Sequence, residues 1–365
     1  MHYKPDWQEA AQRWTALWEG RCGGRPCIAV TAPRGKRTGP ERPAPPARDL
    51  VSGWLDPAHI IPAMLNGFES TFWGGEAYPS PYLLGGWVTM DCGAGFAFPE
   101  DYSTIWFNRA KLDFDRPPNL GFDPENPWLR RYEALHGACV EAAGEDGFLV
   151  GQVTALPGND VLPLLLGTQE FLTALLDHPL WMRSALGQLA EKHARVMEHF
   201  FALTRAVCRY WYGIAGWAHF WAPEPFLVAQ SDVSCMLSPD MFAEFVLPEL
   251  DLLGKRFGRL WYHLDGPAAR RHLPTLLSRD YLRVIQFTPG EGQSPNGPAW
   301  LDIYKEIQAA GRIVWLGLPP ENIEPLIRLL DPALLCFQTQ TRTEGEAREL
   351  LSAAERWTKT WRASH

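Results

Sequence analysis

The feature that most constrains the fold is a regular alternation of apolar strand-like segments with helix-like segments between residues 145 and 357. Helical stretches begin at Thr168, at Pro179 and after a Ser238-Pro239 cap, and another covers about 301–310. We predict strands at 147–156, 209–217, 227–232, 258–266, 282–288, 312–317 and 334–340. Such alternation over more than 200 residues is typical of an α/β protein with a parallel sheet.

Polar residues recur where these strands end, as expected for the active-site face of a barrel. They are Gln152, Thr154, Asp232, His263, Asp265, Gln286, Thr288, Gln338 and Gln340. A doubly wound sheet would usually offer a glycine-rich phosphate turn, and the sequence contains neither G-x-G-x-x-G after a strand nor a Walker A motif. The sequence therefore predicts a (β/α)8 TIM-type barrel.

The first 130 residues are expected to form a helical and irregular cap together with early barrel elements. Trp7, Trp14 and Trp18 share one face of a predicted N-terminal helix. Residues 34–48 are rich in proline, glycine and charge, which predicts a mobile loop or an extended strap over the barrel. Residues 51–128 are expected to be irregular, with short strands. We treat 1–365 as a single domain, with its regular part at 145–357.

Composition excludes several classes of protein. The 365 residues are 46% hydrophobic and 21% charged, which suits a large buried core. A net charge of −8 does not suggest a nucleic-acid partner, and no apolar stretch is long enough to cross a membrane. Seven scattered cysteines without a C-x-x-C pair are typical of reduced thiols. We therefore expect a cytoplasmic protein that acts on a small molecule.

The strongest chemical signal is Tyr262-His263-Leu264-Asp265-Gly266 at the end of an apolar strand. Strand alternation puts His263 and Asp265 on one side, where they could bind a metal or act as a general acid and base. Equally, a buried histidine could simply be paired with a carboxylate. Asp232 lies on a strand-to-helix loop, where it could add a ligand, bind a cation or only cap a turn.

Aromatic and amide side chains near the predicted strand ends are candidates for substrate contacts, although packing between cap and barrel would explain the aromatic ones equally well. Glu291 is the carboxylate of a Gly/Pro-rich loop that could act as a lid. No G-x-S-x-G motif supports a hydrolase. The candidate substrate-binding residues are Trp73, Trp106, Gln152, Trp217, His219, Trp221, Gln286, Glu291 and Gln340.

Four segments of the chain resemble the uroporphyrinogen decarboxylase-like superfamily, over about residues 145–357. SPDMFAEFVLPEL resembles its S-P-x-x-F-x-x-F-x-L-P-x-L segment, and YHLDG occupies the place of the H-x-C-G strand end of its cobalamin-dependent methyltransferases. TRTEGEARELL resembles the closing T-x-E-E-A helix, and LGTQEFLTALLDHPLWM resembles the G-x-E-x-F…P segment. The resemblance implies a (β/α)8 barrel with a cleft at the carboxyl ends of the strands.

The superfamily has two chemistries. Its decarboxylases hold substrate carboxylates with an arginine-rich N-terminal segment, whereas this chain has GRPCIAV at 24–30, although Asp232 lies near the position of their catalytic aspartate. Its methyltransferases bind zinc through a histidine and two cysteines. Here His263 is kept, Asp265 replaces the first cysteine, and Gln340-Thr341 stands near the second position, with Cys336 four or five residues earlier.

The resemblance therefore implies methyl transfer between a small-molecule donor or thiol and a corrinoid, with methylcobalamin carried on a partner protein. Exchanging thiolate for carboxylate favours zinc, manganese or iron with oxygen ligands, held by His263 and Asp265. A cofactor-free decarboxylase using Asp232 and His263 is an alternative. A sugar-binding or glycoside-acting barrel, suggested by aromatic residues beside Glu76, Glu224 and Glu291, is another. A barrel that only binds a ligand also stays open.

Overall fold

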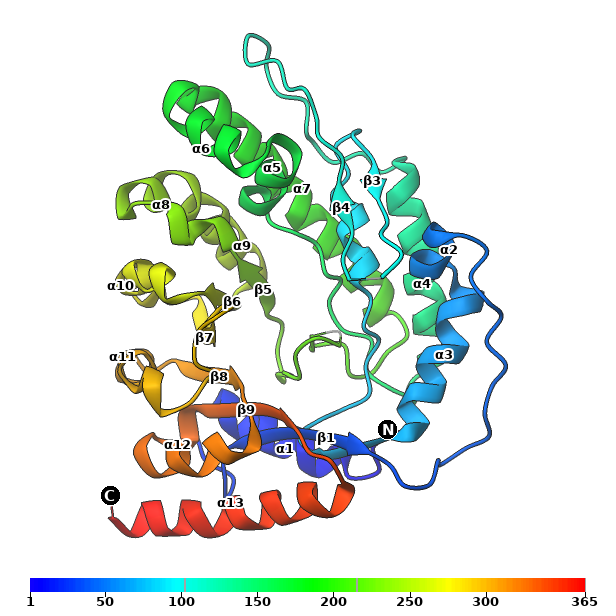
Figure 1. Cartoon of the computed structure of the whole chain (residues 1–365), viewed down its shortest axis with the longest axis vertical. Coiled ribbons are helices and arrows are strands. Elements are labelled where there is room, and N and C mark those ends of the chain that lie inside the picture. The colour runs from blue at the N-terminus through cyan, green and yellow to red at the C-terminus, as the bar shows by residue number, and fades with distance from the viewer. Residues whose placement is uncertain (102, 215, 365) are drawn as a thin grey trace.

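A seven-stranded sheet organises the computed structural model, which describes residues 1–101, 103–214 and 216–364 (Figure 1). Its order is β2-β1-β9-β8-β7-β6-β5, with β2 antiparallel to β1 and all other neighbours parallel. This confirms the α/β class. The strands are β1 (Cys27–Pro33), β2 (Thr71–Gly75), β5 (Leu227–Gln230), β6 (Leu260–Asp265), β7 (Leu282–Thr288), β8 (Ile313–Gly317) and β9 (Leu335–Gln340).

Helices follow the parallel strands and lie outside the curve of the sheet in Figure 1. The expected helix start at Ser238-Pro239 is confirmed, because the Ser238 hydroxyl accepts from the Met241 amide at 3.2 Å. The last helix is capped in the same way, with the Thr343 hydroxyl accepting from the Glu346 amide at 3.1 Å. The helices from the middle of the chain onward are α4 (Pro127–Ala143), α5 (Gly158–Leu166), α6 (Thr168–Asp177), α7 (Pro179–Arg205), α8 (Pro239–Phe245), α9 (Leu247–Phe257), α10 (Leu273–Leu277), α11 (Leu301–Ala309), α12 (Ile323–Leu329) and α13 (Glu344–Ser364).

Both faces of the sheet are buried, because successive strand residues point to opposite sides. The outer face packs against the helices in the main core. The inner face carries a second cluster, which includes Trp261, Val284 and Trp315. Helix α1 (Trp7–Trp18) inserts Trp7 and Trp14 into this inner cluster, as its predicted aromatic stripe required. The amino-terminal end of the sheet is thereby filled with side chains.

The cap is more regular than predicted. Residues 50–70 form α2 (Leu50–Leu55) and α3 (Pro57–Ser70), so the expectation of irregular structure there is wrong. Asp49 and Asp56 cap these helices by accepting backbone hydrogen bonds. The short strands β3 (Phe96–Ala97) and β4 (Trp106–Phe107) form a separate pair. The 34–48 segment is an extended strap along α3, where Arg42 pairs with Glu69 at 2.6 Å.

Two predicted strands do not form as regular strands. Segment 147–156 makes a single parallel bridge, between Gln152 and Ile214, and segment 209–217 contributes only that bridge and one between Gly213 and Trp221; Ala215 lies outside the described residues. The Gln152 side chain then spans to β5, because its amide donates to the Phe226 carbonyl at 3.0 Å and accepts from the Val228 amide at 2.9 Å. A side chain thus replaces the backbone ladder at this edge.

No helix of the described residues is both long and apolar enough to pass through a membrane.

Candidate active site

The inner face of the sheet changes from apolar to polar towards the carboxyl ends of its strands. Along β6 the side chains on this face run Trp261, His263, Asp265. The parallel register places His263 beside Gln230 of β5 on one side and beside Gln286 of β7 on the other. The strand ends therefore bring together His263 and Gln286, which the sequence pattern singled out, and Gln230, which it did not.

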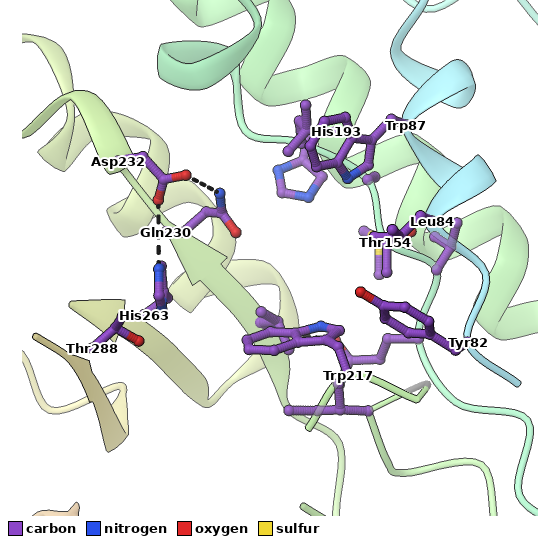
Figure 2. A pocket seen from close by; sticks show the side chains of 17 residues that line it. Tyr82, Leu84, Trp87, Thr154, His193, Trp217, Gln230, Asp232, His263 and Thr288 are labelled. Atoms are coloured by element: carbon purple, nitrogen blue, oxygen red, sulfur yellow. Dashed lines mark hydrogen bonds and ion pairs between the residues drawn. The ribbon is translucent and has the colours of Figure 1, made fainter. Parts of the chain in front are cut away.

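Asp232, His263 and Asp265 form one cluster, and each offers a ligand atom within 4.8 Å of the others. The Nε2 atom of His263 lies 3.7 Å from a carboxylate oxygen of Asp232 (Figure 2). The His263 side chain is 17% exposed and that of Asp232 is 51% exposed, so both reach open space. Asp232 begins a 3-10 turn (Asp232–Met236) directly after β5, which fixes its backbone at the strand end.

Gln286 fixes the orientation of the His263 ring and determines which ring nitrogen carries the proton. The Nδ1 atom of His263 forms a short hydrogen bond to Oε1 of Gln286, and the Gln286 amide nitrogen donates to the Thr288 hydroxyl at 2.6 Å. Because a carboxamide oxygen only accepts, the proton of neutral His263 must be on Nδ1. The lone pair of Nε2 then faces the two carboxylates, an arrangement that a metal ion or a protonated Asp232 would stabilise.

A third carboxylate, Asp160, holds the backbone of Asp232 in place through a hydrogen bond. It lies in the first turn of α5 and accepts from the Asp232 amide at 2.9 Å and from the Gln230 side chain at 2.8 Å. Burial, followed by the charge of Asp232, raises the pKa of Asp160. Asp232 itself loses much of its hydration to the surrounding protein and faces Asp265, which together raise its pKa to about 7. This corner of the site therefore favours a proton or a cation.

A cavity of about 390 Å³ opens in front of Asp232 and His263. Trp217 stands on one side, with its ring centroid 6.2 Å from that of His263 in an edge-to-face arrangement. Tyr82 and Trp87 from the cap line the far side, and Figure 2 shows them facing Asp232 and His263 across the space. An apolar wall with a few convergent polar groups is typical of small-molecule sites.

A buried histidine–glutamate pair completes the lining. His193 of α7 borders the cavity, and its Nδ1 atom lies 3.1 Å from a carboxylate oxygen of Glu249 on α9 (Figure 2 shows His193). The Glu249 side chain is 3% exposed and also accepts from the backbone amide of Gly158 and the side chain of Asn159. A carboxylate held this way orients the histidine, with Nε2 left for a ligand.

The remaining candidate residues divide into three groups. Trp73, His219 and Gln340 line a second cavity, beside the first one. Gln152 borders the first cavity, but both of its amide atoms are used to join β5. The other three candidates line neither cavity. Trp221 packs edge-to-face on Trp7, with ring centroids 5.5 Å apart. Trp106 is 53% exposed on β4, and Glu291 is exposed in the loop after β7.

Two of the three carboxylates invoked for a sugar-acting barrel, Glu76 and Glu224, are engaged in other contacts. Glu76 is fully buried and paired with Arg13 and Arg25. Glu224 accepts a short hydrogen bond from the Trp18 indole. Neither arrangement presents two free carboxylates to one ligand, as glycoside hydrolysis requires.

Sequence reasoning missed four polar residues of the site, namely Gln230, Asp160, His193 and Glu249. Gln230 and Asp160 carried a usable signal, because Gln230 lies near the end of the strand predicted at 227–232 and Asp160 follows the segment at 147–156. His193 and Glu249 lie within helices, where spacing alone does not distinguish a buried polar residue from its neighbours.

The chain matches no protein-family model and no curated protein.

Proposed function

We propose that the chain is a metal-dependent enzyme that transfers a methyl group between a small molecule and a corrinoid carried by a partner protein. The observation that carries the proposal is the cluster of Asp232, His263 and Asp265, whose ligand atoms lie within 4.8 Å of one another, with Nε2 of His263 3.7 Å from Asp232. The choice of methyl transfer rests on the sequence resemblance described above, together with the missing arginine pair of the decarboxylases.

The donor set fits a divalent transition metal with a preference for oxygen and nitrogen. One imidazole and two carboxylates, all within 4.8 Å, would be the protein ligands, and Gln286 would hold the imidazole in the ligating tautomer. Zinc, manganese and iron suit such a set, whereas the thiolates that select zinc in the related methyltransferases are replaced. A metal bound here lowers the pKa of a substrate thiol or hydroxyl, so that its anion can react at neutral pH.

The residues of the chain would handle the proton and the orientation. In transfer to a thiol, the S–C bond forms as the Co–C bond of the methyl corrinoid breaks, the electron pair stays on cobalt, and the thiol loses its proton. His193 is the acceptor for that proton, because Glu249 fixes its Nδ1–H and leaves Nε2 as a base towards the cavity. Trp217 and Tyr82 would exclude water from the reacting sulfur.

The fold that goes with this function is a (β/α)8 barrel. The described sheet is open between its edge strands β5 and β2, and two contacts of the intervening segments support closure. The Gln152–Ile214 bridge joins segment 147–156 to segment 209–217, and the Leu149 amide donates to the Pro79 carbonyl, after β2, at 3.1 Å. In this interpretation segments 149–152 and 213–214 take the places of irregular barrel strands.

A cofactor-free decarboxylase is the second candidate, favoured by one specific observation. The half-exposed carboxyl of Asp232 borders the first cavity and lies 3.7 Å from Nε2 of His263. Burial and the charge of Asp265 raise its pKa, so this carboxyl could hold a proton and deliver it to a carbanion left by loss of CO2. Such an enzyme would release CO2 in the presence of chelators, whereas the metal-dependent transferase would not act.

The first experiment is metal analysis of protein purified without an affinity tag, before and after incubation with Zn²⁺, Mn²⁺ or Fe²⁺. We expect about one metal per chain, lost in His263→Ala and reduced in Asp265→Ala. Asp240→Ala, which removes an exposed carboxylate on α8, is the matched control and should leave metal content unchanged. A folded protein that takes up no metal would refute the proposal and favour the decarboxylase.

The second experiment tests the reaction itself. The metal-loaded protein is mixed with methylcobalamin and a small thiol, and the spectrum of cob(I)alamin is followed under anaerobic conditions. We expect its appearance to depend on metal and to fall at least tenfold in His193→Gln. Metal binding without any methyl transfer from a panel of thiols and methoxylated aromatics would keep the metal site and refute this choice of reaction.

A further inference from the structure

The second cavity has a size and lining suited to a ligand of its own. Its volume is about 610 Å³, within the range of pockets that hold drug-sized molecules. It lies between helix α3, strand β2 and the segment 80–85, with Gln338 and Gln340 of β9 at one side. Apolar side chains make up much of its wall, including Ile60, Met64, Phe68 and Leu83.

No aspartate, glutamate, lysine or arginine is among the described residues that border this cavity, and its ionisable rings include two histidines, His59 and His219. His59 is partly exposed, with its Nδ1 atom 2.7 Å from the Pro45 carbonyl. His219 is buried there, and burial lowers its pKa to about 4, so it is uncharged at neutral pH. Its Nε2 atom lies 3.0 Å from the Tyr78 carbonyl and its Nδ1 atom 3.2 Å from Oε1 of Gln338, so the ring is held in place. A charged guest beside His219 would lose its hydration without gaining a counter-ion from that ring.

Aromatic rings give the cavity flat surfaces. Trp73 packs edge-to-face on Phe68, with ring centroids 5.9 Å apart, and on His219 at the same centroid distance. These rings are fixed by their contacts, so a planar guest could stack on them with little ordering cost. Tyr82 and Leu84 border both cavities, which makes the two spaces neighbours.

We propose that the second cavity binds the uncharged aromatic or aliphatic body of a small molecule. A substituent of that molecule would pass Tyr82 and reach the first cavity beside His263. Binding in the second cavity does not require a metal, so this part stands apart from the function proposed above. Only the placement of the reacting group beside His263 rests on that function.

The test compares two matched probes by isothermal titration calorimetry, 1-naphthol and 1-naphthoate. They share a ring system and differ in charge at neutral pH. We expect saturable binding of 1-naphthol and at least tenfold weaker binding of 1-naphthoate. Equal affinity for the two probes, or no saturable binding of 1-naphthol, would overturn the proposal, and both results come from the unmodified protein.

Three variants locate the probe. Ala63→Phe on α3 places a ring in the second cavity and should weaken 1-naphthol binding at least tenfold. Ala58→Phe is the control, because Ala58 is exposed on the same helix and is outside the lining. Ala155→Phe partly fills the first cavity instead and should change the affinity less than twofold. If only Ala155→Phe abolishes binding, the guest occupies the first cavity and the proposal is wrong. The metal content of the same samples tests the proposed function independently.

Discussion

Two buried histidines should each lower the stability of this protein in mild acid. His136 on α4 is 1% exposed, and burial together with the nearby His199 lowers its pKa to about 4. His219 has a pKa of about 4 as well. In the unfolded chain both would take up protons near pH 6.5. At these two histidines the unfolded state therefore binds more protons than the folded state between about pH 6.5 and pH 4, so their contribution to the free energy of unfolding decreases as the pH falls through this window. The raised pKa values of Asp160 and Asp232 act in the opposite direction, so the histidine contribution is measured as a difference between variants.

The size of the effect follows from these pKa values. A group that titrates near 4 in the fold and near 6.5 when unfolded loses about 2 kcal/mol of stability between pH 7.5 and pH 5, and about 3 kcal/mol once the pH is well below 4. His136 is the more suitable of the two histidines to substitute. Its Nε2 atom forms a hydrogen bond of 2.7 Å with the Thr204 hydroxyl, and neither residue lines either of the two cavities.

The assay is urea unfolding at pH 7.5 and at pH 5, followed by circular dichroism. His136→Gln removes the titrating ring, so its loss of stability between the two pH values should be about 2 kcal/mol smaller than that of the unmodified protein. Thr204→Val is the matched control: it removes the hydrogen bond, keeps the ring, and should lower stability at both pH values without flattening the pH dependence. If His136→Gln shows the same pH dependence as the unmodified protein, the reasoning from burial is refuted.

Three further predictions concern the site. Gln286→Leu should weaken metal binding by about 10- to 100-fold, measured by competition with a chromogenic chelator, because His263 loses the group that orients it; an unchanged affinity would contradict the orienting role. Asp265→Cys should shift metal preference towards zinc over manganese, and competition between the two ions would show whether the carboxylate sets that preference. Gln152→Leu should lower the free energy of unfolding, measured with urea, by about 2–4 kcal/mol, because the Val228 amide and the Phe226 carbonyl would be buried without partners. A decrease below about 1 kcal/mol would mean that water replaces the Gln152 side chain.

Much of the parallel sheet could be predicted from the sequence, and the reason is local. β6 to β9 are largely apolar and buried, and β6, β7 and β9 carry polar residues towards their carboxyl ends, so pattern and position agree. The same rule correctly singled out His263, Asp265 and Asp232 as neighbours. For these strands and site residues, the pattern that predicts the structure lies within a few consecutive residues.

Other parts could not be predicted because their partners are distant in the sequence. Segment 147–156 has the composition of a strand, yet its backbone is paired with Pro79 and Gly213, and its closest link to β5 is a side chain. The His193–Glu249 pair joins two helices across 56 residues, and neither residue breaks the pattern of its own helix. Helices α2 and α3 were missed because glycine and proline are frequent around them, although Pro57 suits a first helical position.

The tryptophans of α1 have a consequence for the order in which molecules enter and leave. Trp7 and Trp14 fill the amino-terminal end of the sheet, and residues at the carboxyl ends of its strands line both cavities. If the proposed function holds and a partner protein covers this carboxyl-terminal side, the small molecule would have to enter before the partner binds. Its product would then leave only after the partner has dissociated, so the lifetime of that complex would limit turnover.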